Sequence, residues 1–144
     1  MPSVTRSRGG MNWKERRHNF RVKTERPVLC FQLDPEARLG EPVPAMTCDV
    51  SSRGISLRFD SAAYVGTRIC VQLRFSDPQL DLFLPARKVR VGATDFGYKF
   101  ESLTLPAQVE LTRFVFAEAK RLNELARAAE AEADDEDAEP ALAA

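Results

Sequence analysis

The sequence lacks the features that would place a protein in a membrane or send it out of the cell. Its 144 residues contain no long apolar run, whereas a transmembrane helix needs about 18 or more consecutive apolar residues. The N-terminus, MPSVTRSRGG, has no apolar stretch after its basic residues, and a secretory signal peptide would need one. We therefore expect a soluble, cytoplasmic protein that does not insert into membranes.

Residues that build common metal and catalytic sites are also few. There is one histidine, His18, and none of the three cysteines stands in a C-x-x-C spacing. Cys30, Cys48 and Cys70 each lie in a strand-like run, which favours small buried side chains over disulfides or metal ligands. The sequence has no P-loop, dinucleotide-binding or H-E-x-x-H motif. We expect a protein that is not an enzyme and that holds no metal and no cofactor.

Positive and negative charges are equal in number but not in distribution. Residues 1–27 carry eight basic residues against two glutamates, whereas residues 118–144 carry nine acidic residues against three basic ones. A neutral body therefore lies between a basic head of +6 (residues 1–27) and an acidic C-terminal segment of −6 (residues 118–144). We expect residues 1–13 to form a flexible basic N-terminus. Residues 129–144 have almost no large apolar side chains, so we expect them to form a disordered acidic tail.

The body of the chain shows the apolar period of two that is typical of β-strands. Turn-forming residues separate the runs, and no helical pattern lies between them. Short strands joined by turns predict an antiparallel barrel or sandwich, here over about residues 20–101. The alternating residues are Leu29, Phe31 and Leu33; Ile55, Leu57 and Phe59; Ile69, Val71, Leu73 and Phe75; Val89 and Val91; and Tyr98 and Phe100.

The apolar period changes to that of a helix after residue 100. Thr104 is a suitable N-cap, and Pro106 is tolerated in a first helical turn. We predict one helix over about residues 105–128, which either packs on the strands or presents its apolar face to a partner helix. That face is formed by Leu111, Phe114, Val115, Leu122 and Leu125.

Three arginines stand close together just ahead of the first strand-like run. The segment ERRHNFR, residues 15–21, contains Arg16, Arg17 and Arg21. A guanidinium group can bind a phosphate or a base edge through two parallel hydrogen bonds. The segment is therefore suited to bind an anion, and the alternative is an ordinary basic tail.

A second polar cluster, CDVSSRG at residues 48–54, leads from a strand into a tight turn. Because side chains alternate along a strand, we expect Asp49 and Ser51 to lie on the same face. Gly54 stands where a hairpin needs a residue with positive φ or where a ligand approaches the backbone. An ordinary turn uses the same residue types, so this cluster alone does not distinguish a binding site from a turn.

Taken together, the two clusters resemble the PilZ domain family, whose members are receptors for cyclic di-GMP. The matching motifs are R-x-x-x-R followed by D-x-S-x-x-G, with a later G-Y-K-F that is similar to the closing motif of the family. The resemblance covers about residues 14–128 and implies a mainly β fold, an antiparallel six-stranded β-barrel followed by one C-terminal α-helix. The motif residues are Arg17, Arg21, Asp49, Ser51 and Gly54.

The resemblance implies which residues bind the ligand. Arg17 and Arg21 would bind a phosphate or the O6 and N7 edge of guanine, and Asp49 would accept hydrogen bonds from the N–H groups on the opposite edge. Ser51 would add a hydroxyl contact, and Gly54 would keep the turn clear. In similar proteins an arginine at the position of Arg16 accompanies an intercalated dimer of cyclic di-GMP, which favours two ligand molecules per chain; the alternative is one ligand, with Arg16 a bystander on a solvated segment.

The resemblance also implies a role in bacterial signal transduction by a second messenger. Ligand binding would order the arginine segment, and an unidentified downstream protein would recognise the new surface. Similar proteins serve motility, exopolysaccharide synthesis and virulence control, and the sequence does not choose among these outputs. It also leaves open whether the protein is a monomer or a dimer.

Two other functions fit a small β-protein with a basic head. A nucleic-acid-binding barrel would use the basic residues, but only Trp13 and Phe20 are placed to stack on bases, and the acidic tail would repel a polyanion. A ligand-independent adaptor with the PilZ fold would act through protein contacts alone, for example by the helix face around Phe114. The intact motifs favour the receptor.

Overall fold

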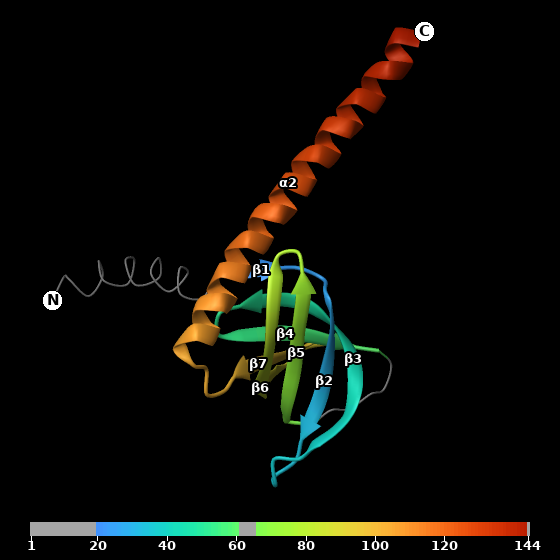
Figure 1. Cartoon of the computed structure of the whole chain (residues 1–144). Coiled ribbons are helices and arrows are strands. Elements are labelled where there is room, and N and C mark those ends of the chain that lie inside the picture. The colour runs from blue at the N-terminus through green and yellow to red at the C-terminus, as the bar shows by residue number, and fades with distance from the viewer. Residues whose placement is uncertain (1–19, 61–65, 144) are drawn as a thin grey trace, which may run out of the picture.

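The chain folds into a β-barrel with one long helix at its C-terminal end (Figure 1). The computed structural model describes residues 20–60 and 66–143, with the backbone alone for 134–143. The segment 1–13, predicted to be flexible, lies outside the described residues. The strands are β1 (Arg21–Lys23), β2 (Pro27–Leu33), β3 (Leu39–Ser51), β4 (Gly54–Phe59), β5 (Arg68–Ser76), β6 (Gln79–Val91) and β7 (Phe96–Phe100), and the helix is α2 (Leu105–Ala143).

Six strands close into a barrel in which every neighbouring pair is antiparallel. Their order is β3-β2-β5-β6-β7-β4, and the pairing of β4 with β3 completes the circle. The short β1 pairs with the C-terminal end of β3, beyond the part that β2 occupies. The predicted fold, a six-stranded antiparallel barrel followed by one helix, is confirmed.

The barrel interior is filled by alternating side chains, and the first half of α2 packs against it. Ile69, Val71 and Leu73 of β5 are fully buried, as their period of two predicts. Phe114 of α2 stacks on Phe75, with 5.2 Å between the ring centroids. Burying a large apolar side chain contributes roughly 1.5–3 kcal/mol. The helix is therefore fixed to the strands by the first part of its predicted apolar face, whereas Leu125, at the end of that face, is 54% exposed.

Two of the alternating runs face differently from the prediction. In β2 the buried residues are Val28 and Cys30, whereas Leu29 is 38% exposed. This strand has apolar residues on both faces, so its period alone does not define the inner one. In β6, Val89 and Val91 are 63% and 70% exposed. The buried side chains of β6 are at even-numbered positions, up to Ala86, so Val89 is at an outward position of the strand, and Val91 ends the strand beyond the irregular pairing at this point.

The cysteines lie where the strand-like pattern indicates. Cys30 and Cys70 are buried, as predicted, whereas Cys48 is half-buried. Burial raises the pKa of the Cys30 thiol to about 12, so this side chain stays protonated near neutral pH. Among the side chains of residues 20–60 and 66–133, no group of three or more His, Cys, Asp or Glu is arranged to hold a metal ion.

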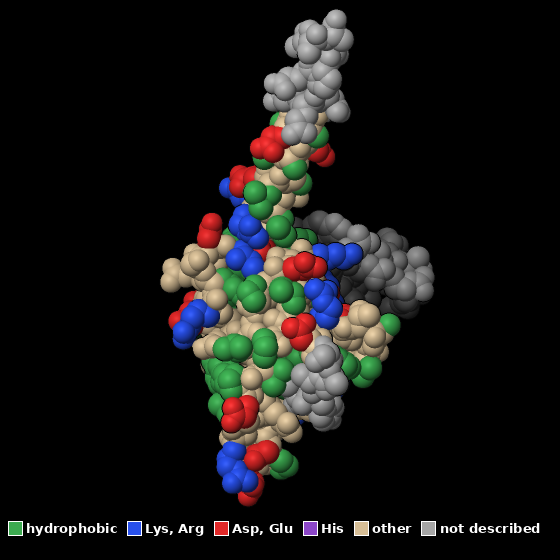
Figure 2. Space-filling view, turned by 90° about the vertical axis from the view of Figure 1, so that its right-hand side faces the viewer, with side chains coloured by type: hydrophobic (Ala, Val, Ile, Leu, Met, Phe, Trp, Pro, Cys, Tyr) green, Lys and Arg blue, Asp and Glu red, His purple; other side chains and the backbone are tan. Residues whose placement is uncertain are grey.

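Helix α2 runs past residue 128, where the sequence pattern predicts its end. Its backbone is helical to Ala143, including residues 129–143, which we expected to be disordered. Residues 123–133 are all exposed, so this part owes its helical form to the high helix propensity of alanine and glutamate rather than to packing. Figure 2 shows side chains of both charge signs on the described part of the projecting helix. No described stretch of helix is long and apolar enough to cross a membrane.

Candidate ligand-binding site

The pairing of β1 with β3 brings the two sequence clusters together. Arg21 lies opposite Ser51, Val22 opposite Val50, and Lys23 opposite Asp49. Both valines are buried, so the polar residues beside them share the outer side of the sheet, as the strand period predicts. The outer surface of β1 and β3 therefore carries the end of R-x-x-x-R next to the start of D-x-S-x-x-G.

Arg21 and Asp49 form an ion pair at this surface. Nη1 of Arg21 lies 3.6 Å from Oδ1 of Asp49, and the two side chains are 61% and 21% exposed. A direct charge-assisted hydrogen bond would be about 2.7–2.9 Å long. The pair is thus loose and the guanidinium is mostly in solvent, so either group can also bind a ligand. Arg16 and Arg17 lie outside the described residues.

Ser51 is directed into its own turn. Its Oγ accepts hydrogen bonds from the backbone N–H groups of Arg53, at 3.2 Å, and Gly54, at 3.0 Å, and it donates to the carbonyl oxygen of Gly54 at 3.3 Å. The side chain is buried. This network fixes the hairpin between β3 and β4, while the expected contact of the hydroxyl with a ligand stays a prediction.

Gly54 serves the packing of the barrel. A Cβ atom at this position would lie 2.4 Å from the carbonyl oxygen of Tyr98 in β7, far inside normal contact. The described glycine with a positive φ is Gly66, at 86°, so left-handed geometry does not explain Gly54. The sequence suggested positive φ or approach by a ligand, whereas the structure shows close approach by the neighbouring strand.

We therefore expect Gly54→Ala to lower the free energy of unfolding by about 1–3 kcal/mol, the usual cost of overpacking. Urea denaturation measures this change. Gly40→Ala is the matched control in β3, because a Cβ there would meet its nearest neighbour, Cβ of Gln32, at an ordinary 3.6 Å. Equal stability of Gly54→Ala and Gly40→Ala would contradict the explanation.

Arg90 lies beside the candidate site and was not predicted from the sequence. The strand registers place Asp49, Ser56, Gly97 and Arg90 in one row across β3, β4, β7 and β6. Nη2 of Arg90 donates to Oγ of Ser56 at 3.1 Å and to Oδ2 of Asp95 at 2.8 Å. Its side chain lies over Gly97, where a Cβ would be 3.0 Å from Nε.

The charged groups in and beside this row shift one another's pKa values. The hydrogen bond to Asp95 and the charge of Asp95 raise the pKa of Arg90, and the charge of Asp49 adds to the effect. The hydrogen bond from Arg90 lowers the pKa of Asp95. Arg90 therefore stays charged at the β6 side of the Arg21 and Asp49 pair. Gly97, at the start of G-Y-K-F, leaves room for the Arg90 side chain. The sequence shows this glycine, but it does not show that β6 is the strand that pairs with it.

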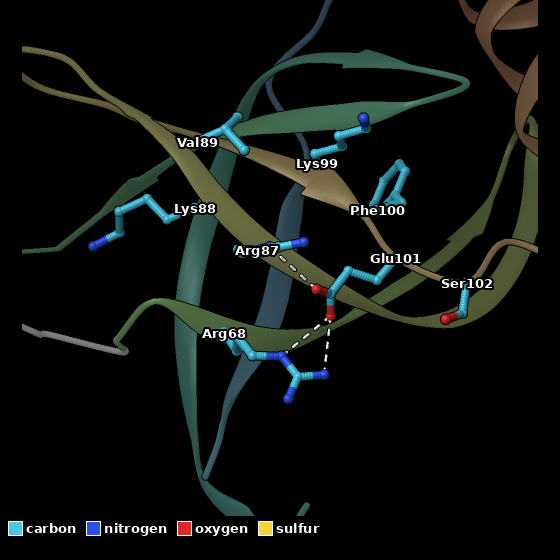
Figure 3. A pocket seen from close by; sticks show the side chains of 8 residues that line it. All are labelled: Arg68, Arg87, Lys88, Val89, Lys99, Phe100, Glu101 and Ser102. Carbon is cyan, nitrogen blue, oxygen red and sulfur yellow. Dashed lines mark hydrogen bonds and ion pairs between the residues drawn. The ribbon is translucent and has the colours of Figure 1, made fainter. Parts of the chain in front are cut away.

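A second row on the same outer side is strongly basic. Gly54, Lys99, Arg87 and Arg68 face one another across β4, β7, β6 and β5. A cleft of about 680 Å³ lies over this row. Arg68 and Arg87 both pair with Glu101, at 3.0 and 3.3 Å, and Figure 3 shows them reaching its carboxylate from different strands. Two guanidinium groups thus share one carboxylate, and because Lys99 also lines the cleft, it is suited to attract anions.

The fold and the outer surface together define a small β-barrel protein with an exposed arginine and aspartate site. A family model described as PilZ domain matches residues 15–117. The chain therefore belongs to the PilZ domain family. No curated protein matches it.

Solved structures of PilZ domains resemble the chain. The PilZ domain of YcgR from Escherichia coli with c-di-GMP has a TM-score of 0.58 and 17% identity, covering 78% of this chain and 98% of that one. YcgR from Escherichia coli in complex with c-di-GMP has a TM-score of 0.56 and 16% identity, covering 79% and 50%. The PilZ domain of CeSA from a cellulose synthesizing bacterium has a TM-score of 0.49 and 20% identity, covering 67% and 94%. At these identities, the likeness to the two YcgR structures shows the fold.

Proposed function

We propose that the protein is a receptor for cyclic di-GMP, which binds on the outer side of the barrel beside Arg21 and Asp49. The observation that carries the proposal is the β1 and β3 register, which places the last arginine of R-x-x-x-R against the D-x-S-x-x-G motif. Membership of the PilZ family supports it, as do two similar structures that contain c-di-GMP. In this role the protein binds and signals, and it catalyses no reaction.

The chemistry of the exposed pair suits this ligand. The Asp49 carboxylate can accept hydrogen bonds from N1 and N2 of guanine, which no arginine can do. The Arg21 guanidinium can bind a phosphate or the O6 and N7 edge in two-point fashion. Because its pair with Asp49 is loose, Arg21 can turn to the ligand at small cost. Arg17 supplies a second guanidinium group for such a two-point contact, and Arg90 borders the site.

We further propose that two ligand molecules bind per chain. Arg16 adds a third planar cation ahead of β1, and the basic row of Arg68, Arg87 and Lys99 lies two residues along the strands from the Asp49 row, roughly 7 Å away. This row would attract the phosphates of a second molecule. Together these cations favour an intercalated dimer over a single cyclic dinucleotide.

Isothermal titration calorimetry at physiological salt tests both proposals. We expect saturable heat with cyclic di-GMP at a stoichiometry near two per chain, and none with GTP. A stoichiometry near one would contradict the ligand dimer but keep the receptor. No binding of cyclic di-GMP by calorimetry and by a second method would contradict the receptor and favour the ligand-independent adaptor. Steeply salt-dependent binding of a short oligonucleotide would instead favour nucleic acid as the ligand.

The output of such a receptor is a protein contact. In this proposal the ligand holds Arg17 and Arg21 against the barrel, and a downstream protein in the bacterial cytoplasm recognises the combined surface. A ligand can shift such an equilibrium only by its difference in affinity for the two states. The arginines supply this difference because they contact the ligand only in the state in which they lie against the barrel.

A further inference from the structure

Phe20, the residue between the two motif arginines and next to Arg21, stacks on Phe116 of α2. The ring centroids are 5.0 Å apart and the ring planes differ by 4°. Phe20 is 38% exposed and Phe116 is 52% exposed, so the pair lies on the surface and not in the core. The stack joins the C-terminal end of the arginine motif to the helix.

A second group of contacts joins the other end of β1 to the same helix. Glu118, two residues after Phe116, is fully buried. It accepts a hydrogen bond from Oγ1 of Thr24, the residue that follows β1. It also accepts two from Arg26, each 2.7 Å long. The three residues of β1 are thus held by α2 at both ends, through a buried carboxylate on one side and an exposed aromatic stack on the other.

We propose that Phe116 is a positioning residue for the ligand site. By stacking on Phe20 it fixes the residue before Arg21, so that the backbone of Arg21 is already held against β3 when the ligand binds. Each residue whose backbone is ordered on binding weakens the observed affinity. The inference rests on the proposed function and adds the helix to it: because coupling is reciprocal, a bound ligand also strengthens the contact between β1 and α2.

Calorimetry on the full chain tests this role with cyclic di-GMP as the probe. We expect Phe116→Ala to weaken binding about two- to tenfold, the range that an aromatic pair supplies. Phe116→Tyr keeps a flat ring and should restore the affinity. Leu125→Ala is the matched control, because this residue of α2 is 54% exposed and lies on the part of the helix beyond the barrel. Unchanged affinity of Phe116→Ala, or equal weakening by Leu125→Ala, would overturn the proposal.

A mutant cycle shows whether Phe116 acts through Phe20. The Phe20→Ala, Phe116→Ala double variant should bind no more weakly than the weaker single variant, because either change removes the same stack. Fully additive weakening would overturn the positioning role. A merely structural contribution of Phe116 would lower the urea midpoint without this pattern in the affinities.

Trypsin cleavage of the chain without ligand separates this inference from the proposed function. Cleavage at Arg21 and Lys23 should be several-fold faster in Phe116→Ala than in Leu125→Ala, because loss of the stack frees the end of β1. If the parent chain binds no cyclic di-GMP, the proposed function fails, but faster cleavage still supports the anchor. Equal cleavage rates would overturn it whatever the ligand.

Discussion

An Arg17→Ala, Arg21→Ala double variant is expected to bind cyclic di-GMP roughly a hundredfold more weakly than the parent chain, or not measurably. Each bidentate contact discriminates by about 1–3 kcal/mol, and every 1.4 kcal/mol changes affinity about tenfold. The Arg21 side chain is 61% exposed, so its removal should leave the barrel intact. Calorimetry measures the affinity, and circular dichroism checks the fold.

The loss of two positive charges needs its own control. Arg38→Ala, Arg74→Ala removes the same charge from side chains that are 73% and 70% exposed on other parts of the barrel. We expect this variant to bind within about threefold of the parent, because salt screens distant exposed charges. Parent-like affinity of a folded Arg17→Ala, Arg21→Ala variant would rule out the proposed site.

The largest expected effect on stability is that of Glu118→Gln. The Glu118 carboxylate is fully buried and pairs with Arg26 and Arg121, each through a contact of 2.7 Å. Breaking a buried ion pair by removing one partner costs about 3–5 kcal/mol, because the other charge is left without compensation. Arg26 is the partner at risk, since only 18% of its side chain is exposed. Urea denaturation at neutral pH measures the change.

The same carboxylate predicts how stability depends on pH. Burial alone would raise the pKa of Glu118, but hydrogen bonds from Arg26, Arg121 and Thr24 outweigh it and lower the pKa from 4.5 to about 2. A lowered pKa stabilises the folded state above pH 4.5, and this contribution is lost as the pH falls toward 2. We expect the parent to lose more stability across this window than Glu118→Gln does.

An exposed glutamate of the same helix provides the control. Glu124→Gln changes the charge equally at an exposed position, so we expect it to keep the parent stability to within about 0.5 kcal/mol. It should also keep the acid sensitivity of the parent. Equal stabilities of Glu118→Gln and Glu124→Gln would show that the buried carboxylate does not hold β1 and β2 to α2.

The sequence predicts much of this fold because the inner faces of most strands are plainly marked. Ile55, Leu57, Tyr98 and Phe100 alternate with polar or small residues, and all four are buried. Leu29 misleads because apolar residues stand on both faces of β2. The length of α2 was missed for a different reason: exposed alanines and glutamates satisfy both the composition of a disordered tail and the propensity of a helix.

Only part of the candidate site could be predicted from the sequence. The motifs indicate Arg21 and Asp49, and the β1 and β3 register shows why they belong together. Arg90 and the basic row depend on which strands pair across the barrel, and this depends on contacts between residues far apart in the chain. Phe116 is one of several apolar residues in a helix, and only the three-dimensional structure distinguishes it as the partner of Phe20.

The central claim is that cyclic di-GMP binds on the outer side of β1 and β3. Titration of the isotopically labelled chain, followed by backbone amide NMR, tests it most directly. We expect the amides of residues 21–23 and 48–54 to shift on saturation, while those of the distant turn at 34–38 stay unchanged. Shifts confined to other parts of the barrel, or none at saturating ligand, would contradict the account.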